Sequence, residues 1–297
     1  MDKWFVIINP KSGKYSKKIK NLLFLLNELT LPYEIHYTAH KNHEIALVNK
    51  ATKKGFNKFI SVGGDGTLHH IVNGVLMQEC IPVEKIKIAV IPIGTGNDWV
   101  KQYEIPQNIF SAIKIINANK TVRQDIGKIV KGSKIIYFNN SAGIGFDGFV
   151  VKKINKKYGA LSYFIASIIS IFSYKKSTLK FSFNNQEIVA KTLMTTIGLC
   201  RFSGGGMQLT HQPDPNDGLF DVTIIKNISI FSLFLNIKKM YNAKLNQHKK
   251  VTSFKTESIK IKLISGDKPY VQADGELIGQ RDFTVTILKN AIQFVVK

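Results

Sequence analysis

The sequence predicts two domains, an N-terminal α/β domain with a mainly parallel sheet and a C-terminal β-sandwich domain. In the first third of the chain, short apolar runs alternate with amphipathic helical patterns, a rhythm typical of βαβ units. From about residue 125 onward, closely spaced strand candidates follow one another, several alternating apolar and polar residues between Asn, Gly or Asp turns. The 297 residues, 44% of them hydrophobic, suffice to fill two cores.

The elements expected in the first domain follow one another in alternation. Strands are expected at residues 4–10, 33–38, 58–64 and 87–94. Helices are expected between them at residues 17–29, 44–54 and 68–77. Because ligands of such sheets bind beyond the carboxyl ends of the strands, we expect functional residues at those ends.

The second part of the chain is read mostly as strands. They are expected at residues 134–142, 179–184, 191–199, 219–225, 258–264, 269–275 and 283–297, with helical interruptions at 158–174 and 230–245. The stretch 158–174, "YGALSYFIASIISIFSY", has no charge and is flanked by lysine pairs. It falls short of the roughly 20 apolar residues that span a membrane, so we expect a buried or membrane-facing helix.

The charge balance points to an anionic partner. Lys and Arg outnumber Asp and Glu by 42 to 20, a formal net charge of +22. Nucleic acid, an anionic membrane and phosphorylated small molecules all fit such a surface, and a lysine-rich solvated face is the competing interpretation. No module that interleaves aromatic and basic residues is visible, so no nucleic-acid partner is expected.

The expected compartment is the cytoplasm. The N-terminal stretch "MDKWFVIINP" lacks the apolar core of a secretion signal and is expected to form the first strand. Two cysteines, Cys80 and Cys200, do not suffice for a disulfide framework or a four-ligand zinc site. We expect both to be buried apolar side chains.

The stretch 63–67, "GGDGT", follows an expected strand and precedes an expected helix. Glycines let the backbone turn sharply and approach a ligand closely, and the helix N-terminus favours a phosphate. Thr67 can cap the helix or bond a phosphate oxygen, whereas Asp65 would repel phosphate unless a metal ion or water mediates. The motif therefore favours a nucleotide with Mg²⁺ over a bare anion, and an ordinary tight βα turn is the alternative.

Other glycine-rich stretches differ from the known phosphate and dinucleotide motifs in their spacing or context. The segments "NPKSG" (9–13) and "GTGND" (94–98) also end expected strands, but the Walker A spacing is absent from the chain. Residues 143–148, "GIGFDG", match G-x-G-x-x-G, yet the next acid after Asp147 is Glu187. A dinucleotide site needs an acid about 20 residues further on, so NAD binding there is not expected.

Eight segments together carry a family resemblance: "NPKSGK", "SVGGDGTLHHIVNGV", "IPIGTGNDW", "DIGKI", "NNSAGIGFDGFV", "YGALSYFIASI", "DPNDGLFDV" and "VQADGE". In this order they resemble the soluble bacterial lipid kinases of the diacylglycerol kinase catalytic-domain family, related to sphingosine kinases and distantly to NAD kinases. The resemblance implies domains at 1–125 and 126–283, with the active site in the cleft between them. It also implies that the last strand, about 284–297, returns to the first domain.

The resemblance further implies site residues. ATP is expected to contact Asn9, Pro10, Lys11, Ser12, Gly13, Thr38, Gly64, Asp65, Gly66, Thr67, Leu68, His69, His70 and Thr95. Glu276 matches the general base that takes a proton from the lipid hydroxyl, and Asp125 matches a further acid of the catalytic cleft. Mg²⁺ is expected on Asp214, Asp217 and the carbonyl of Leu219, linked through water to Asp65. Read alone, Asp214 and Asp217 could equally belong to an ordinary polar turn.

The pair His69-His70 departs from the family pattern. His70 stands where relatives usually carry Glu, which replaces an acceptor with a group that can be neutral or positive. We expect one of the two histidines to contact the nucleotide peripherally, with a plain surface position as the alternative.

The sequence thus predicts an ATP- and Mg²⁺-dependent transferase of lipid metabolism and phospholipid biosynthesis. Its acceptor is expected to be diacylglycerol or a related lipid at an anionic membrane surface, where the protein associates peripherally, and a homodimer is left open. The lysines expected at that surface are Lys238, Lys239, Lys244, Lys249 and Lys250. Two other functions stay open, phosphorylation of a soluble hydroxyl as in NAD kinases and a non-catalytic basic membrane-binding protein.

Overall fold

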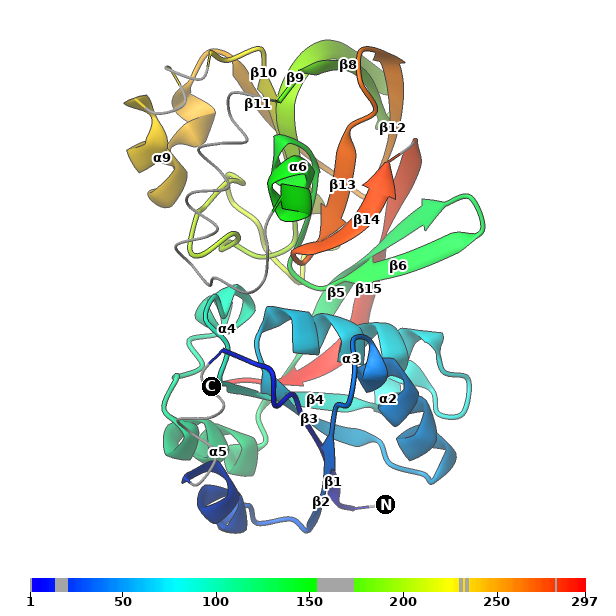
Figure 1. Ribbon diagram of the computed structural model, residues 1–297, viewed down its shortest axis with the longest axis vertical. Coiled ribbons are helices and arrows are strands. Elements are labelled where there is room, and N and C mark those ends of the chain that lie inside the picture. Colours follow the sequence, from blue (N-terminus) through cyan, green and yellow to red (C-terminus); the bar gives the residue numbers. More distant parts are fainter. Residues whose placement is uncertain (1, 14–20, 154–173, 230–231, 233–234, 281) are drawn as a thin grey trace. The chain divides into compact units, whose positions relative to one another are not determined.

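The computed structural model divides the chain into two compact units (Figure 1). It describes all residues except 1, 14–20, 154–173, 230–231, 233–234 and 281. Unit 1 comprises Met1–Ile126 and Lys289–Lys297, and unit 2 comprises Gly127–Leu288. The helix expected at 158–174 lies, but for its last residue, outside the described residues.

Unit 1 is built on parallel strands in the order β2-β1-β3-β4. These strands are β1 (Trp4–Ile8), β2 (Tyr33–Tyr37), β3 (Lys58–Gly63) and β4 (Lys87–Pro92). The end of β15 (Phe283–Val295) adds a further parallel partner, because Gln293 and Phe294 pair with Lys87 and Ile88 of β4. The predicted α/β class is confirmed.

The helices of unit 1 lie on both faces of this sheet, with α2 and α3 on one face and α5 on the other (Figure 1). They are α2 (His43–Lys53), α3 (Asp65–Met77), α4 (Asp98–Gln102) and α5 (Ile109–Ala118), together with the 3-10 turns η1 (Leu26–Glu28) and η2 (Val83–Lys85). All five residues of β1 are buried, as a continuous apolar run covered on two faces requires. Helices α4 and α5 were not predicted from the sequence.

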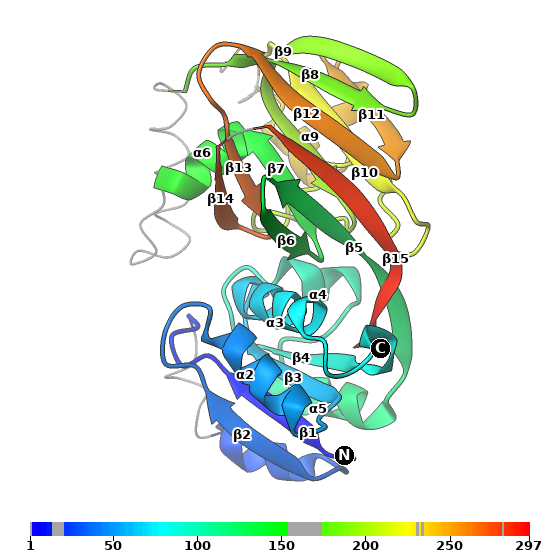
Figure 2. The same cartoon turned by 90° about the vertical axis from the view of Figure 1, so that its right-hand side faces the viewer.

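Unit 2 is an antiparallel sandwich organised by one long strand, β9 (Gln186–Gly198) (Figure 2). The first half of β9 pairs with β8, and its second half pairs with β7 on one side and β10 on the other. The remaining strands are β5 (Thr121–Lys131), β6 (Lys134–Phe138), β7 (Ser141–Gly145), β8 (Ser177–Phe183), β10 (Phe220–Lys226), β11 (Val251–Thr256), β12 (Ser258–Ser265), β13 (Tyr270–Ala273) and β14 (Glu276–Gln280). The predicted sandwich is confirmed, although β5, β11 and β14 were not expected and the single strand expected at 134–142 is divided into β6 and β7.

Short helices interrupt the strands of unit 2. Helix α6 (Phe146–Lys153) follows β7 directly. In the region where a helix was expected at 230–245, the described residues form α9 (Ile237–Tyr241) and the 3-10 turn η4 (Leu245–Gln247). Within the described part of the chain, no helix is long and apolar enough to cross a membrane.

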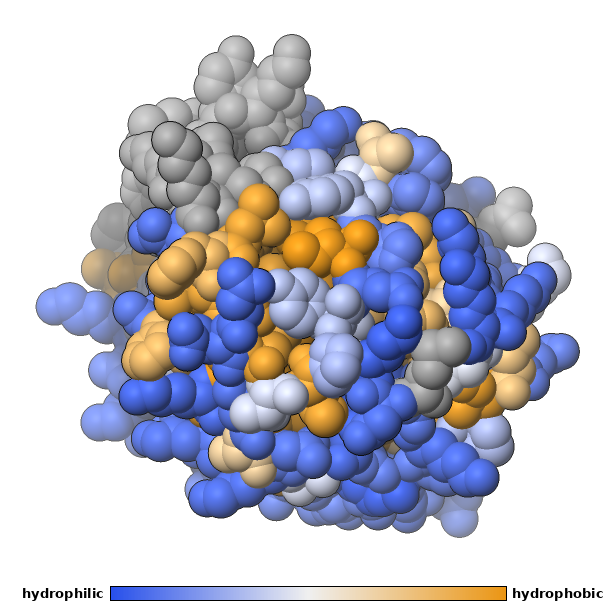
Figure 3. All heavy atoms as spheres, turned by 90° about the horizontal axis from the view of Figure 1, so that it is seen from below, coloured by the Kyte–Doolittle hydropathy of each residue, from blue (hydrophilic) through white to orange (hydrophobic). Residues whose placement is uncertain are grey.

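On the face seen from below, hydrophobic side chains gather among hydrophilic ones (Figure 3). Exposed hydrophobic residues of unit 1 include Phe24, which is 70% exposed, and Phe110 of α5. Cys200 is buried as expected, but the expectation for Cys80 is wrong, because this residue is exposed. Cys80 belongs to the turn after α3, where its backbone N–H donates to Oε1 of Gln78 at 2.8 Å.

Candidate active site

Three segments at the carboxyl ends of parallel strands meet in unit 1. A Cβ atom on Gly94 would overlap the Cα of Gly64, so the loops after β3 and β4 touch backbone to backbone. A Cβ on Gly13 would lie 2.5 Å from Oγ1 of Thr95, which brings the segment after β1 to the same place. The structure therefore brings together three of the expected nucleotide-binding stretches, and only glycine fits at the point of contact.

Asn9 and Thr67 join the first of these segments to the second. Nδ2 of Asn9 donates to Oγ1 of Thr67 at 3.1 Å, and Oδ1 of Asn9 accepts from the N–H of Lys11 at 3.0 Å. Thr67 is only 3% exposed, and its own backbone N–H donates to the carbonyl of Gly64. A hydroxyl that accepts one hydrogen bond still has a proton to donate, so Thr67 can serve both Asn9 and a bound oxygen.

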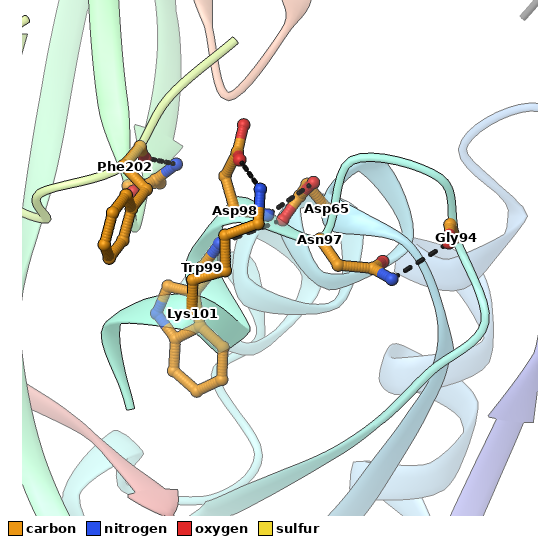
Figure 4. Close-up of polar contacts among 8 residues, drawn as sticks. Asp65, Gly94, Asn97, Asp98, Trp99, Lys101 and Phe202 are labelled. Atoms are coloured by element: carbon orange, nitrogen blue, oxygen red, sulfur yellow. Dashed lines mark hydrogen bonds and ion pairs between the residues drawn. The ribbon is translucent and has the colours of Figure 1, made fainter. Parts of the chain in front are cut away.

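Asp65 joins the second segment to the third (Figure 4). Its two carboxylate oxygens accept from the N–H groups of Asp98 and Trp99, each at 3.1 Å. These are the first two residues of α4, so the Asp65 carboxylate caps the N-terminus of that helix. Asn97, which precedes α4 with a φ of 52°, donates from Nδ2 to the carbonyl of Gly94 at 2.9 Å. The water-mediated link from Asp65 to a metal stays a prediction.

Helix α3 begins at this point and carries the two histidines. His69 is 4% exposed and lies against Asn73, whose Nδ2 donates to the His69 carbonyl at 2.8 Å. His70 is partly exposed, and the two imidazole rings lie 5.1 Å apart between centroids. Of the two residues, His70 is thus the one with a side chain accessible to a ligand.

The remaining expected nucleotide contacts differ in exposure. Leu68 and Thr38 are buried, and the N–H of Thr38 continues the pairing of β2 with the carbonyl of Ile8 at 2.9 Å. Pro10 and Ser12 are partly exposed and Lys11 is exposed. Thr95 is exposed as well, so a ligand can reach both Thr95 and the exposed part of the 9–13 segment.

Asp125 is fully buried on β5. Its Oδ1 accepts from the N–H of Asn290 at 2.7 Å, and Asn290 has a positive φ of 50°. The carboxylate therefore anchors a bend of β15 to β5. The catalytic role that the family resemblance implies for Asp125 stays a prediction.

The segment expected to bind Mg²⁺ is an exposed turn of unit 2. Oδ1 of Asp214 accepts from the N–H of Asn216 at 3.0 Å, and Oδ1 of Asp217 accepts from the N–H of Leu219 at 2.9 Å. Oδ2 of Asp217 forms an ion pair with Nζ of Lys255 at 2.6 Å. Carboxylates and a carbonyl are the donors that a hard cation prefers, so the chemistry fits Mg²⁺, which would share Asp217 with Lys255. Among the residues that the structure describes, no three His, Cys, Asp or Glu side chains are grouped to hold a metal.

Glu276 stands at the start of β14, directly after a two-residue turn. The turn residues Asp274 and Gly275 have φ angles of 48° and 78°, typical of the tight turns that join antiparallel strands. Glu276 is partly exposed and pairs with Ala273 of β13. The Asp274 carboxylate accepts three N–H groups, those of Asn139, Asn140 and Ser141, each at 3.0 Å.

Unit 2 also contains an apolar pocket of about 300 Å³. Its lining comes from strands β7, β8 and β12 and from the segments beside β13 and β14, namely Ile144, Leu179, Ile261, Leu263, Lys268, Pro269 and Asp282.

Around α9, exposed apolar side chains stand among lysines. Leu235 is 71% exposed, Tyr241 is 50% exposed and Ile237 is 41% exposed. Lys238, Lys244, Lys249 and Lys250 are exposed in the same part of the chain, and Lys239 is partly exposed. We refer to residues 235–250 as the α9 patch.

Sequence reasoning missed several residues that hold these loops in place. Asp274 was seen only as part of the Glu276 motif, and Gln272 and Lys255 were not singled out at all. One available signal was the Asp-Gly pair before Glu276, because Asp-Gly is a strong turn signal and the same pair stands before Thr67.

Comparison with known proteins agrees with this arrangement. Residues 3–129 match the model of the diacylglycerol kinase catalytic domain, and residues 140–296 match that of the YegS C-terminal NAD kinase beta sandwich-like domain. The chain is 25% identical over 295 residues to a diacylglycerol kinase of Staphylococcus haemolyticus, covering 97% of this chain and 86% of the relative. It is 26% identical over 295 residues to a diacylglycerol kinase of Staphylococcus carnosus, covering 97% and 93%. A solved structure of a diacylglycerol kinase of Bacillus anthracis has the same fold, with a TM-score of 0.75, 20% identity and coverage of 100% and 97%.

Proposed function

Because the chain belongs to the diacylglycerol kinase family of lipid kinases, we propose that it transfers the γ-phosphate of ATP to the hydroxyl of diacylglycerol or a related lipid. The observation that carries the proposal is the convergence of the 9–13, 63–67 and 94–98 segments at the N-terminus of α3. The N-terminus of a helix and glycine backbone without side chains are the features that bind phosphate.

In this proposal the nucleotide phosphates lie against the loop between β3 and α3. Gly64 and Gly94 let the loops after β3 and β4 pack together beside them, and Thr67 donates its hydroxyl proton to a phosphate oxygen while it accepts from Asn9. Asp65 acts indirectly, because its carboxylate fixes the 94–98 segment through α4. His70 is the expected peripheral contact.

The proposed Mg²⁺ would be held by Asp214, Asp217 and the Leu219 carbonyl. When bound, the cation supplies positive charge that offsets the charge of the phosphates. Lys255 is the present partner of Asp217 and must share this carboxylate with the cation. The buried Asp221, which accepts the N–H groups of His211 and Gln212 at 3.0 and 2.9 Å, fixes the start of the same segment.

Glu276 is proposed as the general base. As the lipid hydroxyl oxygen forms a bond to the γ-phosphorus, its proton passes to the Glu276 carboxylate, the bond from the γ-phosphorus to the bridging oxygen breaks, and ADP leaves. The lipid acyl chain is proposed to enter the apolar pocket of unit 2, whose volume of about 300 Å³ accommodates part of one chain.

The proposed membrane contact is the α9 patch. Exposed Leu, Ile and Tyr side chains between lysines have the composition of segments that lie at a bilayer interface. Each lysine near an anionic surface contributes about 1 kcal/mol of attraction. Replacing Lys238 and Lys239 by Gln should therefore weaken sedimentation with phosphatidylserine vesicles roughly 10- to 30-fold. The same change at Lys260 and Lys262, exposed lysines of β12, is the control and should have a smaller effect.

The central test is phosphorylation of a lipid panel with labelled ATP and mass-spectrometric identification of the product. Replacing Glu276 by Ala should lower kcat by about 10² to 10⁴, the range that a general base contributes. Glu187→Ala is the matched control, because Glu187 is an exposed strand residue paired with Lys180 at 2.7 Å, and its kcat should stay within about twofold of wild type. No phosphorylated lipid from the wild type, or full activity of Glu276→Ala, would overturn the proposal. Phosphorylation of NAD without vesicles would support the soluble-acceptor alternative.

A further inference from the structure

The turn that carries Glu276 is connected to the Asp147 carboxylate through one glutamine. The N–H of Gly275 donates to Oε1 of Gln272 at 2.8 Å, and Nε2 of Gln272 donates to Oδ2 of Asp147 at 2.6 Å. Gly275 is the residue directly before Glu276. The chain of bonds therefore runs from helix α6, which contains Asp147, through β13 to the residue next to the proposed base.

The glycines of the stretch 143–148 make room for this connection. A Cβ on Gly143 would collide with Oδ2 of Asp147 and lie 2.8 Å from Nε2 of Gln272. A Cβ on Gly148 would collide with the carbonyl oxygen of Tyr270, so α6 packs directly on the backbone of β13. Residues 143–148 match G-x-G-x-x-G but do not fit a dinucleotide site. Their glycines instead allow β7 and α6 to pack closely against the hairpin that carries Glu276.

The Gln272 side chain is buried and Asp147 is partly exposed, so their contact is partly buried, unlike an ordinary surface hydrogen bond. Gln272 is 4% exposed, and burial raises the pKa of the Asp147 carboxyl although the Gln272 amide opposes this shift. A buried amide whose acceptor is removed costs about 1 to 3 kcal/mol. A Gln with both ends bonded in this way has one favourable orientation, and that orientation fixes where the Gly275 N–H points.

The opposite side of the same turn is held by Asp274. Its carboxylate accepts the three N–H groups of residues 139–141, and its own N–H donates to the carbonyl of Ser141 at 2.9 Å. Both residues of the turn are thus anchored to the body of unit 2, Asp274 to the start of β7 and Gly275 to α6. Such double anchoring is what a proton-accepting side chain needs, because catalysis is sensitive to displacements of about 1 Å.

We propose that Gln272 and Asp147 are positioning residues for Glu276, holding the turn so that the Glu276 carboxylate meets the acceptor hydroxyl. The inference rests on the proposed function, because it assigns a role relative to the proposed base. Neither side chain takes part in proton transfer itself.

The test uses substitutions that keep volume and remove one hydrogen bond. Gln272→Met retains the length of the side chain without its amide, and Asp147→Leu removes the acceptor, whereas Asp147→Asn keeps an oxygen that can accept from Gln272. Gln280→Met is the matched control, because Gln280 lies on β14 of the same hairpin and donates to the carbonyl of Lys268 at 2.6 Å. For each purified full-length variant, kcat and KM for ATP and lipid are measured, together with hydrogen exchange of peptides spanning 270–280.

The expected result is a loss in kcat and not in nucleotide binding. Gln272→Met and Asp147→Leu should lose about 10- to 100-fold in kcat, with KM for ATP within about twofold and with faster exchange at the turn. Asp147→Asn and Gln280→Met should stay within about threefold of wild type. In the double variant Gln272→Met/Glu276→Ala, kcat should fall no further than in Glu276→Ala alone, because no base is left to position.

Two results would overturn the inference while leaving the proposed function intact. One is a Gln272→Met variant whose hairpin exchanges faster but whose kcat stays within twofold of wild type. The other is an additive loss in the double variant, which would show that Gln272 acts independently of Glu276. If the wild type phosphorylates no lipid, the proposed function fails and this inference fails with it.

Discussion

Two turns of the molecule contain the same pair of residues and use it differently. In unit 1, Asp65-Gly66-Thr67 begins helix α3, and in unit 2, Asp274-Gly275-Glu276 leads from β13 into β14. In both turns the aspartate accepts backbone N–H groups of a neighbouring segment, two for Asp65 and three for Asp274. In both, the third residue carries the side chain that we assign to the reaction.

The difference lies in the backbone. Gly275 and Asp274 both have a positive φ, as a tight hairpin turn requires, whereas Asp65 and Gly66 are already helical. The first turn consequently offers a ligand the N–H groups of a helix end, and the second offers a single projecting side chain. The comparison teaches that both Asp-Gly pairs are anchored by the aspartate, and that the element after the pair decides whether backbone or side chain meets the substrate.

Removal of the Asp274 carboxylate is expected to have the largest effect on stability. Asp274→Ala leaves three backbone donors without this acceptor, and we expect a loss of about 3 to 5 kcal/mol in the free energy of unfolding. Asp274→Asn keeps one oxygen, the one that can serve Asn140 and Ser141, and should lose about 1 to 2 kcal/mol. Denaturant unfolding monitored by circular dichroism measures both values, and equal losses in the two variants would contradict the anchoring role.

The corresponding change in unit 1 should be milder. Asp65→Ala removes the cap of α4, a helix of five residues, and we expect a loss of about 1 to 2 kcal/mol in stability. Because the cap also positions the 94–98 segment, we expect KM for ATP to rise about tenfold in Asp65→Ala. The KM of Asp65→Asn should lie between those of the wild type and Asp65→Ala. Thermal unfolding and steady-state kinetics measure the two effects, and an unchanged KM would separate Asp65 from nucleotide binding.

The third residue of the first turn should affect binding more than folding. Thr67→Val retains the shape and loses the hydroxyl that accepts from Asn9, so stability should fall by about 1 kcal/mol and KM for ATP should rise. Thr67→Ser keeps the hydroxyl and serves as the control. A Thr67→Val variant with wild-type affinity in an equilibrium ATP-binding titration would refute the phosphate contact.

The smallest expected effect concerns the pH dependence of unit 2. Burial raises the pKa of the Asp147 carboxyl in the folded protein. The contribution of this carboxyl to the free energy of unfolding is therefore fully present below the ordinary pKa of an Asp. That contribution is lost as the pH rises from about 4 through the raised pKa of the folded state. Asp147→Asn has no such group, so the melting temperature of the wild type should fall relative to that of the variant over this range. A constant difference between pH 4 and pH 8 would contradict the raised pKa.

The fold class followed from the sequence because hydrophobic periodicity is local. The expected strands at 4–10 and 58–64 contain β1 and β3, and the glycine stretches stand at their ends as expected. Helix α4 was missed because five residues carry too little periodicity, and the strand β14 was missed because it is short and alternates weakly. Both errors concern elements whose boundaries depend on contacts with distant parts of the chain.

The site was predicted as a set of residues, but not as a set of contacts. Sequence spacing does not predict that Asp65 caps a helix starting at Asp98, because the two residues are brought together only when the sheet forms. The same holds for Asp125 and Asn290, which come from β5 and β15. Gln272 was not singled out because alternation along a strand predicts that only one of two successive side chains is buried. In the structure both Val271 and Gln272 are buried, and the register of the strand pairing shifts between them.

The return of β15 to unit 1 has a consequence for the order in which the chain is made. The edge of β4 is paired by Gln293 and Phe294, and Phe294 packs against Trp99 with ring centroids 4.7 Å apart. On a ribosome, the first 126 residues emerge before the whole of unit 2, and at typical rates of synthesis the last strand follows on the order of ten to thirty seconds later. Until then the β4 edge is open to other strands, so the nascent chain is most exposed to mispairing and to chaperones during that interval.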